Sequence, residues 1–159
     1  MKREVSTYDR ALNLLAFRAR SVSELRSALI RKGEPRANVE EAIVRLLEQR
    51  LLDDAAFAQQ FARMRILGPG ASRLRISQEL RRRGVAMEVI DRAIEELQVD
   101  EGLDPSSGIQ RVAEKKWRSM AKLDDFTRKR RLYAFLARRG FNPDEIRGAI
   151  NAIGSAASA

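Results

Sequence analysis

The sequence predicts an all-α fold made of three tandem three-helix repeats, about nine helices in all, from three observations. One pattern of apolar, basic and glycine positions occurs three times, the second copy 51 residues after the first and the third 56 residues after the second. Ala, Leu, Arg and Glu are more abundant than β-branched and aromatic residues, which favours helix over strand. In each copy a glycine follows a basic residue where a helix would end. The three copies are Leu25, Leu29, Lys32-Gly33, Val39, Ala42-Ile43 and Leu46; Ile76, Leu80, Arg83-Gly84, Ile90, Ala93-Ile94 and Leu97; and Leu132, Leu136, Arg139-Gly140, Ile146, Ala149-Ile150 and Ile153.

The first repeat contains clear signals for its helix ends. Its first helix covers about residues 8–18, where apolar residues recur at helical spacing. Ser21 and Glu24 have the spacing of a capping box, which starts the second helix. Gly33 ends that helix, where a left-handed residue belongs, and the third helix follows Pro35.

The second repeat opens at Asp53-Asp54, since acidic residues suit a helix N-terminus. The Gly-Pro-Gly sequence within residues 67–72 cannot be helical, so these residues form a loop in which Ser72 caps the second helix. Gly84 ends that helix, and the third helix covers about residues 87–98.

The third repeat follows residues 102–108, which form the clearest linker and an expected hinge. Asp124 or Asp125 caps its second helix. Asn142 caps its third helix, with Pro143 in the first turn. The three repeats are expected at residues 8–52, 53–101 and 109–153, followed by a flexible tail at 154–159.

The recurring apolar residues are assigned to the core, where the second and third helices of each repeat pack together. The small alanine allows these helices to approach closely, and the glycine permits the sharp turn between them. Four aromatic residues at helical spacing are also assigned to the core rather than to base stacking: Phe57, Phe61, Trp117 and Phe126. An internal repeat of this kind indicates a modular binding surface rather than one catalytic pocket.

Composition excludes several classes of function. The 159-residue chain has a net charge of +9, which indicates a polyanionic partner, either nucleic acid or an assembly that contains it. It has no cysteine and no histidine, which removes thiol nucleophiles, the commonest general base and the commonest metal ligand. There is no P-loop or dinucleotide fingerprint, and the carboxylate pairs Asp53-Asp54 and Asp124-Asp125 stand where helix caps are expected. We therefore expect no enzyme activity, cofactor or metal.

No apolar run approaches the roughly 20 residues that span a bilayer. The segment Met1–Thr7 is short and polar, unlike a signal peptide. We therefore expect a soluble, cytoplasmic protein that does not contact membranes.

Charge is distributed unevenly between the helices. The second-helix regions, residues 24–33, 73–83 and 126–139, hold three, five and six basic residues against one, one and no acidic residues. The third-helix regions, residues 34–50, 85–101 and 142–153, hold three, one and one basic residues against four, six and two acidic residues. Phosphates would repel these third helices, so we do not expect a helix-turn-helix that reads the major groove.

Part of this pattern has a structural explanation. Cations near a helix C-terminus interact favourably with the helix dipole, which accounts for Lys32, Arg83 and Arg139. Cations in the first turns are unfavourable there, so we expect a partner outside the helix to compensate them. These cations are Arg73, Arg75, Arg128, Lys129, Arg130 and Arg131.

The helical period of 100° per residue predicts a basic stripe along the second helices. Arg75 and Arg82 point outward when Leu80 points inward. Arg131 and Arg138 occupy the same positions in repeat three, whereas repeat one has Glu24 and Arg31, which makes its stripe weaker. The candidate residues for binding a partner or nucleic acid are Arg31, Arg73, Arg75, Arg82, Arg128, Lys129, Arg130, Arg131 and Arg138.

Several segments resemble the RecX family, regulatory proteins that modulate the recombinase RecA. They are Arg20-Ser21-Val22-Ser23-Glu24-Leu25 through Lys32-Gly33, Leu52-Asp53-Asp54-Ala55-Ala56-Phe57-Ala58, and Arg73 through Gly84 with Val89-Ile90-Asp91-Arg92-Ala93-Ile94. With the weaker third repeat, the similarity covers about Tyr8 to Ile153. Gln49-Arg50 departs from the family, which commonly has a glycine before the Leu-Asp-Asp step.

The resemblance implies an elongated, curved array of three-helix units that lodges in the groove of a RecA filament on single-stranded DNA, most simply as a monomer. It also implies inhibition of filament growth, ATP hydrolysis, strand exchange and co-protease activity. The residues themselves leave two alternatives open. One is a basic helical protein that binds single- or double-stranded DNA directly without sequence specificity, and the other is a structural scaffold without a nucleic-acid partner.

Overall fold

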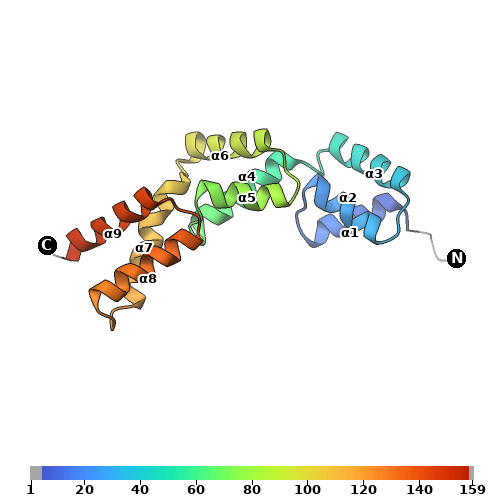
Figure 1. The fold of residues 1–159 in the computed structure, drawn as a ribbon. Coiled ribbons are helices and arrows are strands. Elements are labelled where there is room, and N and C mark those ends of the chain that lie inside the picture. Colours follow the sequence, from blue (N-terminus) through green and yellow to red (C-terminus); the bar gives the residue numbers. More distant parts are fainter. Residues whose placement is uncertain (1–4, 158–159) are drawn as a thin grey trace. The chain divides into compact units, whose positions relative to one another are not determined.

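The computed structural model describes residues 5–157, with side chains as far as Ser155. Within this range the chain forms nine α-helices and one short 3-10 helix and has no strand (Figure 1), so the predicted all-α class is confirmed. Residues 1–4 and 158–159, which include parts of the polar N-terminus and of the predicted tail, lie outside the described residues. The helices are α1 (Thr7–Phe17), α2 (Val22–Arg31), α3 (Arg36–Glu48), α4 (Asp54–Leu67), α5 (Arg73–Arg82), α6 (Met87–Glu101), η1 (Pro105–Ser107), α7 (Gly108–Ser119), α8 (Asp125–Arg138) and α9 (Pro143–Ala157).

Capping side chains start five helices where the sequence predicts them. The Glu24 amide donates to the Ser21 hydroxyl at 3.1 Å, and the Ser21 amide donates to the Glu24 carboxylate at 3.2 Å. Asn142 and Glu145 form the same reciprocal pair at the start of α9. Asp53, Ser72 and Asp124 cap α4, α5 and α8. Because each cap satisfies backbone amides that the first helical turn leaves free, local sequence decides these starts.

The recurring apolar positions form the core. In all three copies these residues are buried, apart from the half-buried Ile150. In repeat one, α1 and α2 both pack on α3, and in repeat three, α7 and α8 both pack on α9. Burial of each second helix along its apolar side leaves its basic side to solvent.

The contacts group the chain into two compact units that do not coincide with the repeats. One unit comprises residues up to Gln60 together with Leu80–Ala93, and the other comprises Phe61–Glu79 together with Ile94 onwards. The grouping arises because the start of one second helix contacts the end of the next. In the first unit, the Ser21 hydroxyl donates to the Arg83 carbonyl oxygen.

The same junction occurs in the second unit, where the Ser72 hydroxyl donates to the Arg139 carbonyl oxygen at 3.2 Å. These close contacts explain why glycine stands at the ends of α5 and α8. A Cβ at Gly84 would overlap Ser23, and one at Gly140 would lie 2.5 Å from the Ser72 hydroxyl oxygen. Gly33, by contrast, has no described atom near enough to meet an added Cβ. All three glycines also have positive φ, between 77° and 88°, which disfavours any side chain.

Three segment boundaries differ from those expected. Helix α6 continues past residue 98 to Glu101, because the next left-handed glycine is Gly102, with φ of 65°. The expected linker, residues 102–108, contains the 3-10 helix η1 and a buried Pro105. Helix α9 continues through Gly154 to Ala157, where a tail was expected, since a single glycine costs a helix only about 1 kcal/mol.

Two residues have environments that the sequence did not predict. Phe126 was assigned to the core, but its side chain is 77% exposed. It precedes the buried Leu132 by six residues, which places it about 120° away from the core-facing direction of α8. Arg50 is the one described non-glycine residue with positive φ, 55°, and it stands at the Gln49-Arg50 departure noted above.

Candidate polyanion-binding surface

Helix α8 presents its basic residues to solvent because its apolar residues anchor the opposite side. Leu132 and Leu136 are fully buried in the core of repeat three. Four predicted site residues of this helix are exposed, and within the described part of the chain they make no ion pair. They are Lys129, Arg130, Arg131 and Arg138.

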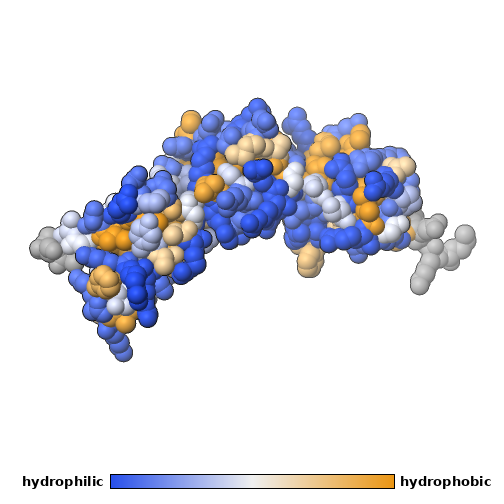
Figure 2. Space-filling model, in the orientation of Figure 1, coloured by the Kyte–Doolittle hydropathy of each residue, from blue (hydrophilic) through white to orange (hydrophobic). Residues whose placement is uncertain are grey.

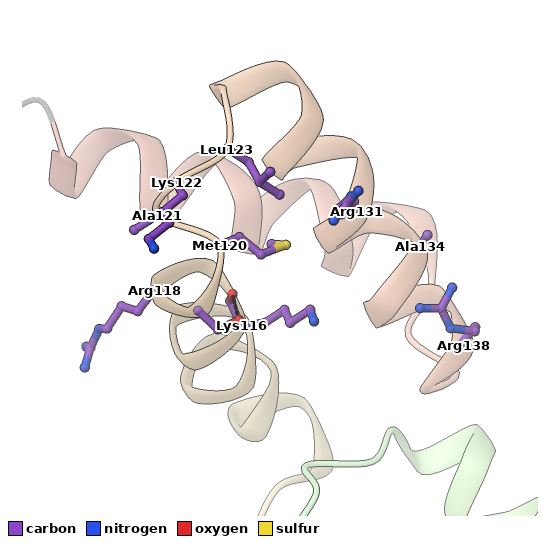
Figure 3. Close-up of a pocket in the computed structure, with 10 residues that line it drawn as sticks. Lys116, Arg118, Met120, Ala121, Lys122, Leu123, Arg131, Ala134 and Arg138 are labelled. Carbon is purple, nitrogen blue, oxygen red and sulfur yellow. Dashed lines mark hydrogen bonds between the residues drawn. The ribbon is translucent and has the colours of Figure 1, made fainter.

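The structure brings two of these residues together in one hollow. Arg131 and Arg138 line an open cavity of about 670 Å³ between α8, the end of α7 and the turn that joins them (Figure 3). Lys116, Arg118 and Lys122 add further cations to its lining, and Met120, Leu123 and Ala134 supply apolar atoms. None of the described lining residues is acidic.

The cations of the hollow are compensated to different degrees. Figure 3 shows Lys116 extending from α7 toward the Arg138 end of α8, whereas Arg118 points away from α8. Arg118 forms an ion pair with Glu114 at 3.6 Å, and its side chain is 80% exposed. The Lys116 ammonium lies 5.2 Å from the centre of the Phe135 ring, which leaves its charge unneutralised. The uncompensated cations of the hollow are therefore Lys116, Lys122, Arg131 and Arg138.

Lys116 and Lys122 were not among the predicted site residues. That prediction rested on the charge of the second helix of each repeat, whereas these lysines lie near the end of α7 and in the following turn. A signal was available, since residues 115–122 hold four basic residues and no acidic one. Only the packing of α7 against α8 places that run beside Arg131 and Arg138.

A second hollow, of about 260 Å³, adjoins the first and shares Lys116 and Ser119 with it. Arg111 and Arg139 line it and are held by backbone carbonyl oxygens. Arg111 donates to Ile66 at 2.9 Å, and Arg139 donates to Pro69 at 2.5 Å. Burial lowers the pKa of Arg139 from its ordinary value, but carbonyl partners leave both guanidinium charges in place.

Arg128 has a local role instead. Its guanidinium carbon lies 3.7 Å from the centre of the Trp117 ring, and it donates to the Trp117 carbonyl oxygen at 3.0 Å. Its side chain is only 16% exposed, and Asp125 lies 3.5 Å away. These contacts fasten the start of α8 to α7 and make Arg128 a weak candidate for contact with a partner.

The predicted residues of α5 fall into two groups. Arg75 pairs with Glu79 at 2.9 Å, and Glu79 also pairs with Arg65 at 2.7 Å. Because the two arginines share one carboxylate, the charge of Arg75 is only partly balanced. Arg73 and Arg82 are exposed, and Arg82 makes no ion pair within the described residues. Hydrophilic residues cover most of the visible face of the α5 segment, interrupted by a small hydrophobic patch (Figure 2).

In repeat one, charged residues of the second helix form ion pairs with other residues of the same repeat. Arg26 binds Glu40 through two hydrogen bonds, of 2.7 Å and 3.0 Å. The hydrogen bond from Arg26 lowers the pKa of Glu40, and the same bond raises the pKa of Arg26. Glu24 pairs with Arg18 at 3.1 Å. The predicted site residue Arg31 is exposed and makes no ion pair among the described residues.

The carboxylate pairs serve as caps. The Asp53 carboxylate accepts from the amides of Ala55 and Ala56, and the Asp124 carboxylate accepts from the Thr127 amide, which lowers the pKa of Asp124. Within residues 5–157, no cluster of three or more acidic side chains is arranged to hold a metal ion. The helices of that range include none with the length and apolarity needed to cross a bilayer.

Three models of the RecX family match this chain, one for each repeat. The first three-helix domain of RecX matches residues 8–46, the second matches residues 53–94 and the third matches residues 108–150.

Curated relatives are similar over most of the chain. The regulatory protein RecX of Pelodictyon phaeoclathratiforme is 36% identical over 88% of this chain and 84% of its own length. The regulatory protein RecX of Halorhodospira halophila is 38% identical over 89% of this chain and 84% of its own length. The crystal structure of RecX from Lactobacillus salivarius has a TM-score of 0.76, covers 93% of this chain and 94% of its own, and is 20% identical, which supports the fold alone.

Proposed function

Because this chain belongs to the RecX family of regulatory proteins, we propose that it is a non-enzymatic, mainly negative regulator of the RecA recombinase. It acts in the cytoplasm as a monomer and binds in the groove of the RecA filament on single-stranded DNA. There it inhibits filament extension, ATP hydrolysis, strand exchange and co-protease activity, and so acts in recombination, DNA repair and the SOS response.

One observation carries this proposal furthest: the second and third repeats expose cations that no carboxylate of the described residues compensates. Arg82 on α5 and Arg131 and Arg138 on α8 are exposed and unpaired within the described residues. A filament that contains nucleic acid offers the missing negative charge. The net charge of +9 adds long-range attraction to such a partner.

Several weak contacts on one chain would bind a filament more tightly than any of them alone. Once one repeat is bound, the others are held near their sites at a high effective concentration. A chain that contacts adjacent recombinase subunits would hinder the rearrangement that each ATP cycle requires, which links binding to inhibition.

The test is the single-stranded-DNA-dependent ATPase activity of the cognate RecA, measured while this protein is titrated in. We expect the rate to fall to a plateau, and we expect the effect to weaken as salt is raised, because the contacts are ionic. An unchanged ATPase rate at saturating protein contradicts the proposal, as does binding to the filament that is insensitive to salt.

The second candidate function is direct, non-specific binding of single- or double-stranded DNA, favoured by the same uncompensated cations. A gel-shift assay that compares naked DNA with RecA-coated DNA separates the two functions. Preferential binding to coated DNA supports filament regulation, whereas equal or stronger binding to naked DNA supports the alternative.

A further inference from the structure

We propose that the hollow between α7 and α8 binds the phosphodiester backbone of a single-stranded nucleic acid, and that exposed aromatic residues of α8 stack against its bases. The proposal deepens the proposed function, on which it rests for the nature of the partner. It assigns the nucleic-acid contact to repeat three and divides that contact between two sides of one helix.

The charge of the hollow selects an anion. Lys116, Lys122, Arg131 and Arg138 line it, no described carboxylate lines it, and none of the four has an ion-pair partner in the described chain. The nearest acidic side chains at the start of α8 are engaged elsewhere. Asp124 accepts from the Thr127 amide, and Asp125 lies 3.5 Å from Arg128. Among the described lining residues, Arg118 alone has a carboxylate partner, Glu114, so an anion in the hollow would meet the other four cations without competition from an ion pair.

The shape of the hollow selects an extended ligand rather than a small anion. Arg131 and Arg138 are seven residues apart, which separates their attachment points by about 10 Å along α8. The adjoining second hollow continues the basic lining through Lys116 and adds Lys115, Arg111 and Arg139. A chain of phosphates can contact cations spread over this distance, whereas a single phosphate group cannot reach all of them.

The aromatic residues of α8 indicate a nucleic acid rather than an acidic protein. Phe126 is 77% exposed and Tyr133 is 38% exposed. They are seven residues apart on α8 and therefore lie on one side of it, with Arg130 between them. Aromatic faces that alternate with cations are typical of surfaces that bind single strands, because unpaired bases stack on the rings while cations contact the phosphates. Stacking of this kind requires bases that are not paired.

The experiment measures binding of a fluorescein-labelled single-stranded oligonucleotide by fluorescence anisotropy, without recombinase present. The test variant carries Lys122→Gln, Arg131→Gln and Arg138→Gln. The control carries Arg36→Gln, Arg50→Gln and Arg92→Gln, which remove the same charge from exposed positions outside both hollows. Circular dichroism verifies that both variants keep the helical content of the parent protein.

We expect the test variant to bind at least tenfold more weakly than the control. Its dependence of log K on log salt should also be shallower by about two, since each lost phosphate contact removes about 0.7 from the slope for single strands. Equal weakening in both variants overturns the proposal, because net charge alone would then explain the binding. Trp117, the one tryptophan of the chain, follows Lys116 on α7 and provides a second signal, since its fluorescence should change on binding in the parent protein.

A second arm separates stacking from charge. Phe126→Ala removes an exposed ring, so the fold should persist, and it should weaken binding to oligothymidine roughly tenfold. The same substitution should not affect binding to an abasic strand of equal length. If Phe126→Ala weakens both equally or neither, the stacking assignment is wrong.

Competition identifies the source of the anion. Unlabelled oligothymidine should displace the labelled strand, whereas tripolyphosphate and polyglutamate at equal charge should compete weakly. Equal competition by tripolyphosphate would indicate a site for free polyphosphates, and equal competition by polyglutamate would indicate an acidic protein surface; either result overturns the proposal. RecA regulation is measured by the ATPase titration instead, so the two proposals can fail separately.

Discussion

Helices α2 and α8 hold the same place in repeats one and three, yet their ends and their charges are used in opposite ways. The start of α2 is covered, since Ser21 donates to the Arg83 carbonyl oxygen, and its end at Gly33 is open. The end of α8 is covered at Gly140, close to Ser72, while its start carries exposed cations. Arg26 of α2 is neutralised by Glu40, but Arg131 and Arg138 have no such partner among the described residues.

The difference shows that the same helical module can either engage its polar groups in junctions and ion pairs or leave its cations uncompensated within the described residues. A second helix that contacts the next repeat at its start uses its polar groups in the junction. No hydrogen bond of this kind is made at the start of α8 within the described residues, and the cations Arg131 and Arg138 keep no ion-pair partner there. In repeat three, Lys116 near the end of α7 and Lys122 in the following turn add to them.

The largest expected effect concerns the two helix ends. Gly140→Ala should lower the free energy of unfolding by about 3 kcal/mol, because it adds a collision with Ser72 to the cost of a left-handed alanine. Gly33→Ala should cost only about 1 kcal/mol, because it carries the conformational cost alone. Urea unfolding followed by circular dichroism measures both. Equal losses of unfolding free energy in the two variants would mean that the contact between Gly140 and Ser72 adds no constraint, and that the ends of α2 and α8 do not differ in this respect.

The helix starts provide the next test. Ser21→Ala should cost about 2 kcal/mol, since it removes both the cap of α2 and the hydrogen bond to Arg83. Asp124→Ala should cost less, because Asp124 is exposed and only caps α8. Thermal unfolding of the two variants gives the ranking, and a larger loss at Asp124 would contradict it.

Repeat one also ends on a strained residue. Arg50→Gly should raise the free energy of unfolding by about 0.5 kcal/mol, because relief of the left-handed arginine slightly exceeds the entropy that glycine loses on folding. Arg50→Ala is the matched control and should give no gain, since it keeps a Cβ at the same positive φ. Chemical unfolding of both variants tests this, and a gain with alanine would assign the effect to charge.

The smallest expected effect concerns the ion pair between Arg26 and Glu40 in repeat one. Because Arg26 lowers the pKa of Glu40 in the folded state, the pair contributes stability above the ordinary glutamate pKa of 4.5. That contribution is lost as pH falls through the lowered value. Glu40→Gln should therefore be slightly less stable than the parent protein at pH 7 and equally stable at pH 2. A difference that persists at pH 2 would assign the effect to packing rather than charge.

Local signals predicted most of the fold because they act within a few residues. Ser21 with Glu24, and Asn142 with Glu145, satisfy backbone amides of their own first turns, so no distant contact is needed to place those helix starts. The core residues recur at fixed offsets because each repeat buries the same sides of its second and third helices. Phe126 was misassigned because helical spacing does not say which apolar residues of a helix face the core.

The basic surface was predictable only in part. The charge of α8 and the outward direction of Arg131 and Arg138 follow from the sequence through the helical period. Lys116 and Lys122 could not be joined to them, because their proximity depends on how α7 packs against α8. The same limit applies to Arg75 and Arg128, whose local contacts with Glu79 and Trp117 appear only in three dimensions.

The sequence specified the helices, most of their ends and the excess of positive charge on the second helices, because these depend on neighbouring residues and on a regular period. The tertiary structure alone decided which cations remain uncompensated and which of them share a hollow. Charge compensation depends on distances between side chains of different helices, and those distances exist only once α7, α8 and the turn between them have packed together.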